Sequence, residues 1–310
     1  MKVAVFGGTG FVGNYIIKQL LSQGNRPHLL VRTGSEKKIE NKNDCNIVIG
    51  DINDNNSINE TLKECQAIIY NIGIIREFPN KGITYYNLHY EGAKRCIDAA
   101  IKLKIRRFIL MSANGVKENG TGYQKTKFLA EQYLKNSNLD YTIFRPSLVF
   151  GRPIDPSHPE FCSQLKKDML DIPFPAPNFF IGINPIQAGD FAMSPIHVKD
   201  VANIFVKSIN ENRTIKKTYC LGGKKIYWEN IIKIISDSYG KNKWIIPAPL
   251  FVVKAIANVF EGFEWFPITK DQLTMLIEGN ICNSLEIKKI FDIGLIPFCS
   301  DSLTYLNKTN

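Results

Sequence analysis

Tyr123 and Lys127 are the residues whose types and spacing most clearly suggest acid–base chemistry. They lie four positions apart, so in a helix both side chains would occupy one face. A neighbouring ammonium group favours the phenolate and lowers the pKa of a tyrosine toward a range that suits proton transfer. An inert pair on a surface helix would have the same spacing. The elements around the pair must therefore decide between the two interpretations.

A glycine-rich turn follows the apolar run 2–6 and precedes helical apolar spacing over 11–23. Gly7 permits a tight turn, Gly10 lets the backbone approach a pyrophosphate, and Gly13 lets the helix pack closely on the strand. The helix N-terminus adds free N–H groups and a partial positive charge. A tight turn without a ligand is the alternative. We expect a dinucleotide phosphate site made by Gly7, Thr9, Gly10, Phe11, Val12 and Gly13.

The charge at the end of the second expected strand indicates which dinucleotide is bound. Arg32 stands there, followed by Lys37 and Lys38, and no carboxylate ends the strand. An acidic residue would bind the ribose 2′-hydroxyl of NAD(H), whereas a cation accommodates a 2′-phosphate. NADP(H) is therefore favoured over NAD(H), unless Arg32 is an ordinary solvated cation. Asp51, after the third strand, is placed either to accept from an adenine amine or to cap its own loop.

Strand and helix patterns alternate through the first half of the chain, and they must position these residues. Capping-box spacing from Ser57 to Glu60 predicts the start of one of the helices. Such alternation predicts a parallel sheet covered on both faces, a doubly wound (Rossmann) α/β fold. The expected strands are 2–6, 28–31, 46–49, 67–72, 107–111 and 141–144, and the expected helices 11–23, 57–65, 85–104 and 123–135.

The alternation stops after Arg145. Residues 152–195 are rich in proline and phenylalanine, and they predict long loops around a pocket. A strand at 219–221 is expected among helices at 198–210, 227–239, 249–260, 270–278 and 284–291. We therefore expect a dinucleotide-binding domain over 1–150 and a smaller, mostly helical domain over 151–310. Apolar residues from Phe251 to Phe266 predict either core or a docking surface for a membrane-bound complex.

The composition describes an ordinary globular chain. Its 310 residues are 44% hydrophobic, which excludes a disordered chain, and the formal charge of +10 favours anionic partners. No apolar run approaches the length of a membrane span. The seven cysteines are scattered without a C-x-x-C pair, so they predict neither a disulfide framework nor a zinc site. With four isolated histidines, no metal site is expected, and a reducing, cytoplasmic location follows.

The chain resembles the extended and atypical short-chain dehydrogenase/reductases over nearly its whole length. More narrowly, it is similar to the nucleotide-binding accessory subunits of respiratory complex I and their bacterial relatives. Segments 71–79 and 267–273 point to the narrower group, whereas the glycine turn is shared by the superfamily. The resemblance rests on residues 7–13, 70–79, 87–100, 107–112, 123–131, 144–151, 197–201, 219–223 and 267–273.

The resemblance implies NADPH at the carboxyl ends of the strands. Asn71 and Gly73 would line the cofactor, Pro146 and Leu148 would flank the nicotinamide, and Tyr123 and Lys127 would contact it. It further implies that the second domain covers the site and that residues 183–210 return to the first domain.

Active members carry a Ser or Thr just past the fifth strand to polarise the substrate. Either Ser112 fills that place, or it ends the strand and Ala113 falls there, which would remove a donor worth a factor of order 10²–10³ in rate.

These observations predict an NADP(H)-binding accessory or assembly subunit of a respiratory NADH–quinone oxidoreductase, peripheral on the inner membrane. The alternative is a free-standing reductase or sugar-nucleotide epimerase/dehydratase. In that enzyme Tyr123 is the acid and base, Lys127 lowers its pKa, and Ser112 or Asn114 polarises the substrate. RNA binding ranks third, because the lysines are scattered rather than clustered with aromatic residues, so nucleic acid is not an expected partner.

Overall fold

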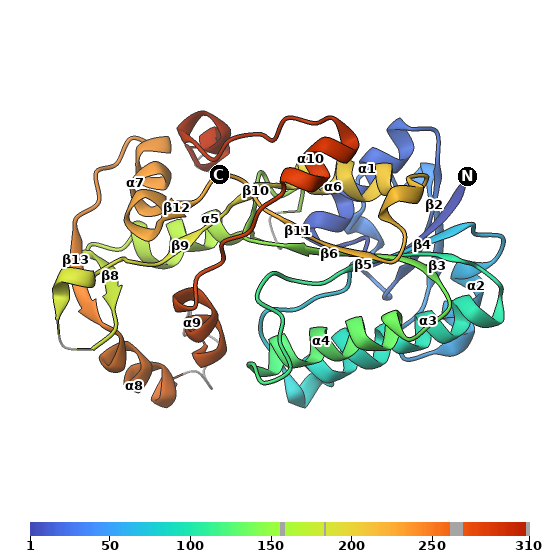
Figure 1. Ribbon diagram of the computed structural model, residues 1–310, viewed down its shortest axis with the longest axis horizontal. Helices are drawn as coiled ribbons and strands as arrows, with labels where there is room; N and C mark the ends of the chain where they lie inside the picture. The colour runs from blue at the N-terminus through green and yellow to red at the C-terminus, as the bar shows by residue number, and fades with distance from the viewer. Residues whose placement is uncertain (156–158, 183, 261–268, 308–310) are drawn as a thin grey trace.

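A seven-stranded sheet forms the centre of the larger of two lobes (Figure 1). The computed structural model describes residues 1–155, 159–182, 184–260 and 269–307, and the side chains of 187 and 256–260 are not described. The strand order is β11-β6-β5-β4-β1-β2-β3, and every neighbouring pair is parallel. The strands are β1 (Lys2–Phe6), β2 (Arg26–Val31), β3 (Asn46–Ile49), β4 (Ala67–Tyr70), β5 (Arg107–Met111), β6 (Asp140–Pro146) and β11 (Lys217–Leu221). The expected doubly wound fold is confirmed.

Helices cover both faces of the sheet, as Figure 1 shows. On one face lie α1 (Phe11–Ser22), α6 (Val198–Ser208) and α10 (Leu285–Phe291), which bury a core that includes Leu20, Phe144 and Phe205. On the other face lie α2 (Asn55–Leu62), α3 (Gly92–Lys102) and α4 (Gly122–Lys135). A π-helical turn, η4 (Tyr86–Glu91), leads directly into α3, so the long helix expected at 85–104 is two joined pieces.

The start of α2 differs from the expectation. Asp54 is its N-cap, and its carboxylate accepts hydrogen bonds of 3.1 Å from the N–H groups of both Asn56 and Ser57. The capping box at Ser57 is therefore wrong. An acidic oxygen accepts these N–H groups more strongly than a hydroxyl, because the helix N-terminus carries partial positive charge.

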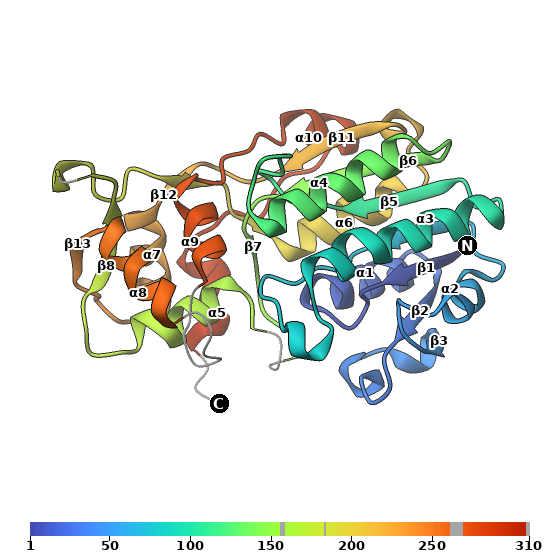
Figure 2. The ribbon, with the colours of Figure 1, turned by 90° about the horizontal axis from the view of Figure 1, so that it is seen from below.

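Late segments of the chain complete the large lobe. Strand β11 pairs in parallel with β6, from Lys217 opposite Thr142 to Leu221 opposite Pro146. The buried guanidinium of Arg107 joins this edge to the end of α6, because it donates to the carbonyl of Ile209 over 3.1 Å and to the hydroxyl of Thr142 over 2.8 Å. The expected strand at 219–221 is thus the seventh strand of the central sheet (Figure 2).

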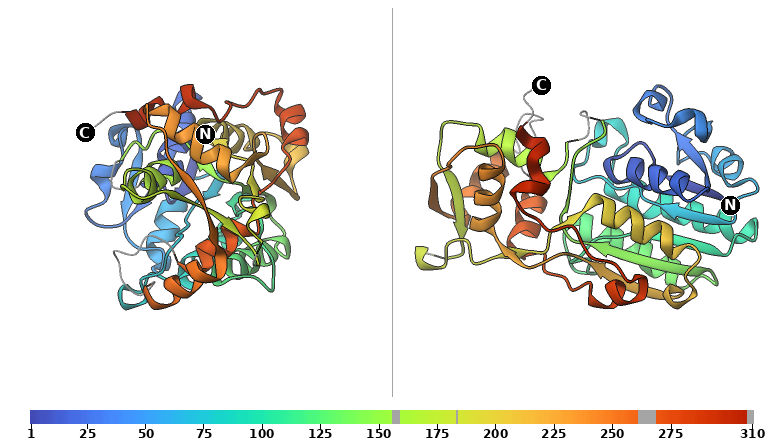
Figure 3. Two further views of the ribbon diagram at one scale, coloured as in Figure 1. Left: turned by 90° about the vertical axis from the view of Figure 1, so that its left-hand side faces the viewer. Right: turned by 90° about the horizontal axis from the view of Figure 1, so that it is seen from above.

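The smaller lobe lies beyond the carboxyl ends of the strands (Figure 3). Its core forms around Trp228, whose ring lies 6.0 Å from that of Phe179 and 5.4 Å from that of Phe191. Its helices are α5 (Phe161–Leu165), α7 (Trp228–Ser238), α8 (Leu250–Phe260) and α9 (Lys270–Ile277). Its strands are the parallel pair β8 (Ala176–Phe180) and β13 (Ile245–Pro249) and the antiparallel pair β9 (Ala192–Met193) and β12 (Ile226–Tyr227), while the short pair β7 (Val149–Phe150) and β10 (Ile196–His197) lies between the lobes.

The apolar segment expected at 251–266 is mostly exposed in its described part, 251–255. Phe251 is 64% exposed and Val252 41%, so these two side chains are not core. Val253, by contrast, is half-buried and packs against the core around Trp228. The side chains of 256–266 are not described, and residues 267 and 268 of the segment 267–273 also lie outside the described residues. Among the described helices, none is both long and apolar enough to cross a membrane.

Candidate functional site

The turn between β1 and α1 needs glycine at two positions. Gly7 has φ +91°, and a Cβ there would lie 2.9 Å from the carbonyl carbon of Asn71 in the neighbouring strand end. A Cβ on Gly13 would lie only 2.1 Å from the carbonyl oxygen of Gly7. The first helical turn can therefore approach the strand this closely only with glycine at both places.

The N-terminus of α1 is open to an anion. Gly10 is the N-cap, no described side chain caps it, and the first turn contains no acidic residue. A Cβ on Gly10 would meet nothing closer than the Gly7 carbonyl oxygen at 3.5 Å. Uncapped N–H groups with free space before them are what a pyrophosphate requires.

Asn71 lies beside this turn with an unsatisfied polar atom. Its amide Nδ2 donates to the carbonyl of Gly7 over 3.3 Å, while its buried Oδ1 has no hydrogen-bond partner among the described residues. A buried amide oxygen is costly to leave unpaired, and a bound ligand can supply the missing donor. Together with the uncapped helix, Asn71 fits a dinucleotide.

The residues expected at the adenosine end follow β2 and β3, the two strands on the side of β1 opposite to β4. Arg32 directly follows β2 and is exposed, and Lys38 lies 3.9 Å from the carboxylate of Asp155. Asp51 is exposed, and its Oδ1 accepts from the backbone N–H of Asn53 over 2.9 Å and from its side-chain amide over 2.7 Å. The carboxylate of Asp51 thus caps its own loop, one of its two expected roles.

Lys127 connects the ends of two strands. Its side chain is buried, and its ammonium group donates to the carbonyls of Ile72 over 3.2 Å and Met111 over 3.0 Å. A Cβ on Gly73 would lie 3.3 Å from the same nitrogen, so Gly73 leaves room for it. Burial lowers the pKa of Lys127 to about 8.

Tyr123 does not have the lowered pKa that its spacing from Lys127 predicts. Burial raises the pKa of Tyr123 to about 12. Its ring lies edge-on to Tyr85 at 5.7 Å and to His89 at 5.1 Å, while the lysine ammonium is bonded to backbone carbonyls. That expectation is wrong in this structure, because desolvation outweighs any stabilisation of the phenolate.

His89 is a residue of the site that the sequence did not indicate. Its Nε2 accepts from the backbone N–H of Ile74 over 3.1 Å, so the neutral ring carries its proton on Nδ1, which lies 3.1 Å from the hydroxyl of Thr126. The ring thereby connects the loop after β4 to α4. Burial holds the pKa of His89 well below its usual range. No motif surrounds this histidine, and its role depends on contacts distant in sequence.

Ser112 is buried, and its hydroxyl donates to Oε1 of Glu131 over 2.5 Å. The same carboxylate accepts two bonds from Arg145, of 2.8 Å to Oε1 and 2.5 Å to Oε2, and Lys135 lies 3.5 Å from it. Glu131 is fully buried, so this cluster holds a charge inside the protein. The Ser112 hydroxyl is a member of the cluster.

The remaining expected residues lie along the same carboxyl edge of the sheet. Pro146 ends β6 beside Leu221, and the carbonyl of Leu148 accepts from the N–H of Ile196 over 2.8 Å. Asn114 donates to Oδ1 of Asn280 over 2.7 Å, a contact with the segment that follows α9. The smaller lobe therefore reaches this edge through residue 280.

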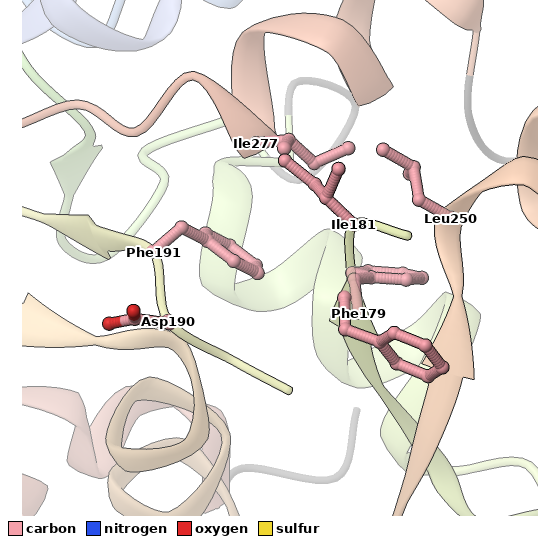
Figure 4. Close-up of a pocket in the computed structure, with 7 residues that line it drawn as sticks. Phe179, Ile181, Asp190, Phe191, Leu250 and Ile277 are labelled. Atoms are coloured by element: carbon pink, nitrogen blue, oxygen red, sulfur yellow. The ribbon is translucent and has the colours of Figure 1, made fainter. Parts of the chain in front are cut away.

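A separate pocket of about 220 Å³ lies inside the smaller lobe. It is lined by apolar side chains with one carboxylate, that of Asp190 (Figure 4). Its residues come from β8, the segment before β9, and helices α8 and α9, so it is distinct from the glycine turn.

Comparison with known proteins finds a family match for the first half of the chain. Residues 7–156 match the family described as NAD(P)H-binding. This part of the chain is an NAD(P)H-binding domain. Across this domain and beyond it, the chain is 26% identical over 315 residues to the mitochondrial NADH-ubiquinone oxidoreductase 40 kDa subunit of Neurospora crassa, covering 97% of this chain and 77% of that protein.

One further relative and one solved structure extend the comparison. The Photosystem II assembly factor Ycf39 of Trieres chinensis is 25% identical over 296 residues, with 94% of this chain and 86% of that protein covered. The UDP-glucose 4-epimerase of Thermus thermophilus, solved in complex with NAD, superposes with a TM-score of 0.71 at 16% identity, covering 99% of this chain and 98% of that one. The resemblance to the short-chain dehydrogenase/reductases and to complex I accessory subunits is confirmed.

Proposed function

We propose that this protein is an NADP(H)-binding accessory or assembly subunit of a respiratory NADH–quinone oxidoreductase. Support comes first from the relatives, one of which is a subunit of NADH-ubiquinone oxidoreductase and another an assembly factor for photosystem II. One relative is thus part of an oxidoreductase complex, and the other acts in the assembly of a photosystem. The membrane complex is the proposed partner, and the protein is proposed to lie peripherally on the membrane that contains it.

One contrast carries the proposal. The glycines and the uncapped helix N-terminus of the dinucleotide turn support binding, whereas the polar groups expected to polarise a substrate are held in structural contacts. The Ser112 hydroxyl donates to Glu131, and the Asn114 amide donates to Asn280. Tyr123 has a raised pKa, which disfavours the phenolate needed of a base at neutral pH. This arrangement supports cofactor binding without turnover.

In this role the bound cofactor stabilises the folded protein. A ligand that binds only the folded chain stabilises it by mass action, by about 2.7 kcal/mol at a hundredfold excess over Kd. The residues proposed to hold it are the Gly7–Gly13 turn, Asn71, Gly73 and Lys127, with Pro146 and Leu148 beside the nicotinamide. When bound, the nicotinamide ring supplies hydride chemistry, which this role does not require.

NADP(H) is proposed over NAD(H) because of Arg32. Its exposed guanidinium directly follows β2, where the fold places the 2′ substituent of the adenosine ribose. Lys37 is nearby, whereas Lys38 is partly neutralised by Asp155. A guanidinium matches the geometry of a phosphate, so it favours the phosphorylated cofactor.

The smaller lobe offers a surface for docking. Several large apolar side chains on and around β8, β13 and α8 are exposed, among them Trp244 at 79% and Phe251 at 64%. These three elements lie at the end of the molecule remote from β1 and α1, which flank the glycine turn (Figure 2). Exposed apolar side chains gathered in this way are typical of interaction surfaces. The others are Phe174, Ile181, Ile186 and Ile246.

The test is gentle purification of the tagged chain from its native membranes, followed by mass spectrometry of retained ligands and partners. We expect NADPH together with subunits of a respiratory complex. The double variant Trp244→Ser, Phe251→Ser should lose the partners and keep the cofactor. Ile101→Ser is the control: it changes an exposed apolar side chain on α3, in the larger lobe, and should keep both the partners and the cofactor. A purified protein that oxidises NADPH with a carbonyl or quinone, and loses this activity on Tyr123→Phe, would instead establish the enzyme.

A further inference from the structure

Two half-buried cysteines, Cys220 and Cys282, meet at the carboxyl edge of the central sheet. Cys220 lies near the end of β11, and Cys282 lies in the segment between α9 and α10. The two thiols share a side-chain hydrogen bond. The sequence gives no sign of this pairing, because the two residues are far apart and form no motif.

The surrounding contacts fix both sulfur atoms. A Cβ on Gly222 would lie 2.6 Å from Sγ of Cys282, so that sulfur packs directly on the backbone that follows Cys220. The backbone N–H of Cys282 donates to the hydroxyl of Ser194 over 3.2 Å. On the other side, Sγ of Cys220 lies 3.5 Å from Oδ1 of Asn114. The pair is thus held where the two lobes meet.

The charges around the pair make the two sulfurs different. The hydrogen bond from Cys282 is the main cause that lowers the pKa of Cys220 to about 7, and the guanidinium of Arg145, its partner on β6, acts in the same direction against burial. The shared bond and burial raise the pKa of Cys282. Near neutral pH a partly ionised Cys220 therefore lies beside a protonated Cys282, which is the arrangement of an attacking and a resolving cysteine.

The other cysteines with altered pKa values provide a contrast. Burial raises the pKa of Cys45 to about 11 and that of Cys65 to about 12, and it raises those of Cys96 and Cys162 well above the usual range. Thiols held in the protonated form in this way react slowly with oxidants.

We propose that Cys220 and Cys282 are a peroxide-sensitive dithiol that closes reversibly into a disulfide. The Cys220 thiolate attacks one oxygen of a hydroperoxide, the O–O bond breaks, and Cys220 becomes a sulfenic acid while hydroxide or alkoxide leaves. The Cys282 sulfur then attacks the sulfenic sulfur, the S–S bond forms, and water leaves. Overall, two thiols lose two protons and two electrons, and with hydrogen peroxide two waters are produced. A thiol reductant reverses the reaction.

The disulfide would covalently join β11 of the central sheet to the segment that leads from α9. That segment already contacts the sheet edge, since Asn280 accepts from Asn114 through its side chain and from the Ser147 hydroxyl through its carbonyl over 2.7 Å. Oxidation would therefore fix the smaller lobe on the edge where the cofactor is expected. This site is independent of whether the chain joins a respiratory complex.

The test uses the reduced full-length protein, treated with one to two equivalents of hydrogen peroxide, digested without reductant and analysed by mass spectrometry. We expect one linked pair of peptides that contain Cys220 and Cys282, lighter than the reduced pair by about 2 Da and separated by dithiothreitol. No linked pair, or Cys220 linked to another cysteine, would overturn the proposal.

Variants identify the two roles. In Cys282→Ser, dimedone should trap a sulfenic acid on Cys220, whereas in Cys220→Ser, Cys282 should stay unmodified. Cys299→Ser, which removes another half-buried thiol, is the control and should leave the cross-link unchanged. Equal oxidation of Cys282 in the Cys220→Ser variant would contradict the assigned roles, and thermal melting of each variant verifies that it is folded.

Discussion

The hydroxyl of Ser112 donates a 2.5 Å hydrogen bond to Oε1 of Glu131, a carboxylate with no exposed surface. A bond between a hydroxyl and a buried charge stabilises the fold. We expect Ser112→Ala to lower the free energy of unfolding by about 1–3 kcal/mol, because the carboxylate loses a donor that no water replaces. Urea unfolding measures this, and NADPH affinity should stay within about twofold. Unchanged stability with a lost reductase activity would return Ser112 to a catalytic role.

Gly13→Ala should abolish cofactor binding. Its new methyl group would collide with the carbonyl of Gly7, so α1 must move away from the strand and the phosphate cradle is lost. Calorimetric titration with NADPH should show no heat of binding, and the melting temperature should no longer rise with NADPH. Gly294→Ala is the matched control, since a Cβ there would meet no described atom within 4 Å. Retained binding in Gly13→Ala would exclude the proposed phosphate site.

Arg32→Asp should weaken NADPH binding by about tenfold or more, because a charge-assisted bond to phosphate is worth roughly 1.5–3 kcal/mol. NADH affinity should change much less. The measurement is the ratio of the two dissociation constants in wild type and variant. Lys102→Asp, an exposed charge reversal on α3, controls for the net charge and should leave the ratio unchanged. Equal losses for both dinucleotides would reject the 2′-phosphate assignment.

Stability should fall in acid through His89. Burial lowers the pKa of this imidazole in the folded protein, so below the unfolded value of about 6.5 the unfolded chain binds more protons. The stabilisation is present above pH 6.5 and is lost as the pH falls, by up to about 1.4 kcal/mol per pH unit. His89→Gln keeps hydrogen-bonding capacity but does not titrate. As the pH falls from about 6.5 to 5, wild type should lose stability faster than this variant, so their unfolding free energies should approach each other. Parallel plots of unfolding free energy against pH for the two proteins would contradict the prediction.

Alkylation of Cys220 should follow an ionisation near pH 7. At that pH about half of the thiol is ionised, roughly fifteenfold more than for a free cysteine. Since the hydrogen bond from Cys282 is the main cause, Cys282→Ala should move the midpoint of the iodoacetamide rate profile upward. Peptide mass spectrometry with isotopic labels gives the rate for Cys220 alone. A midpoint that stays in place would indicate that Arg145 acts without Cys282.

The features predicted well from the sequence are local ones. The glycine turn and the apolar strands of the first half are determined by residues next to one another, so their predicted boundaries agree with the structure to within about two or three residues. The Asp54 cap was missed because Ser57 has the same capping chemistry three residues later. Where two residues could cap the same helix, the charged carboxylate is the stronger acceptor and becomes the N-cap.

The features that the sequence did not predict are those that bring distant residues together. The raised pKa of Tyr123 depends on burial among Tyr85 and His89, and the Ser112–Glu131 bond depends on how α4 lies over β5. A spacing of four residues says nothing about which carbonyls an ammonium group will reach. The Cys220–Cys282 pair is likewise created by the return of the chain after α9.

The position of β11 has a consequence for how the protein is made. During synthesis β6 leaves the ribosome long before residues 217–221, which form β11. Until β11 emerges, β6 is an open edge strand whose backbone can pair with another chain. The helices α6 and α10, which lie with α1 on one face of the sheet, are also translated late. Until most of the chain has been made, α1 alone can cover that face. Chaperone dependence during synthesis is the natural outcome of that order.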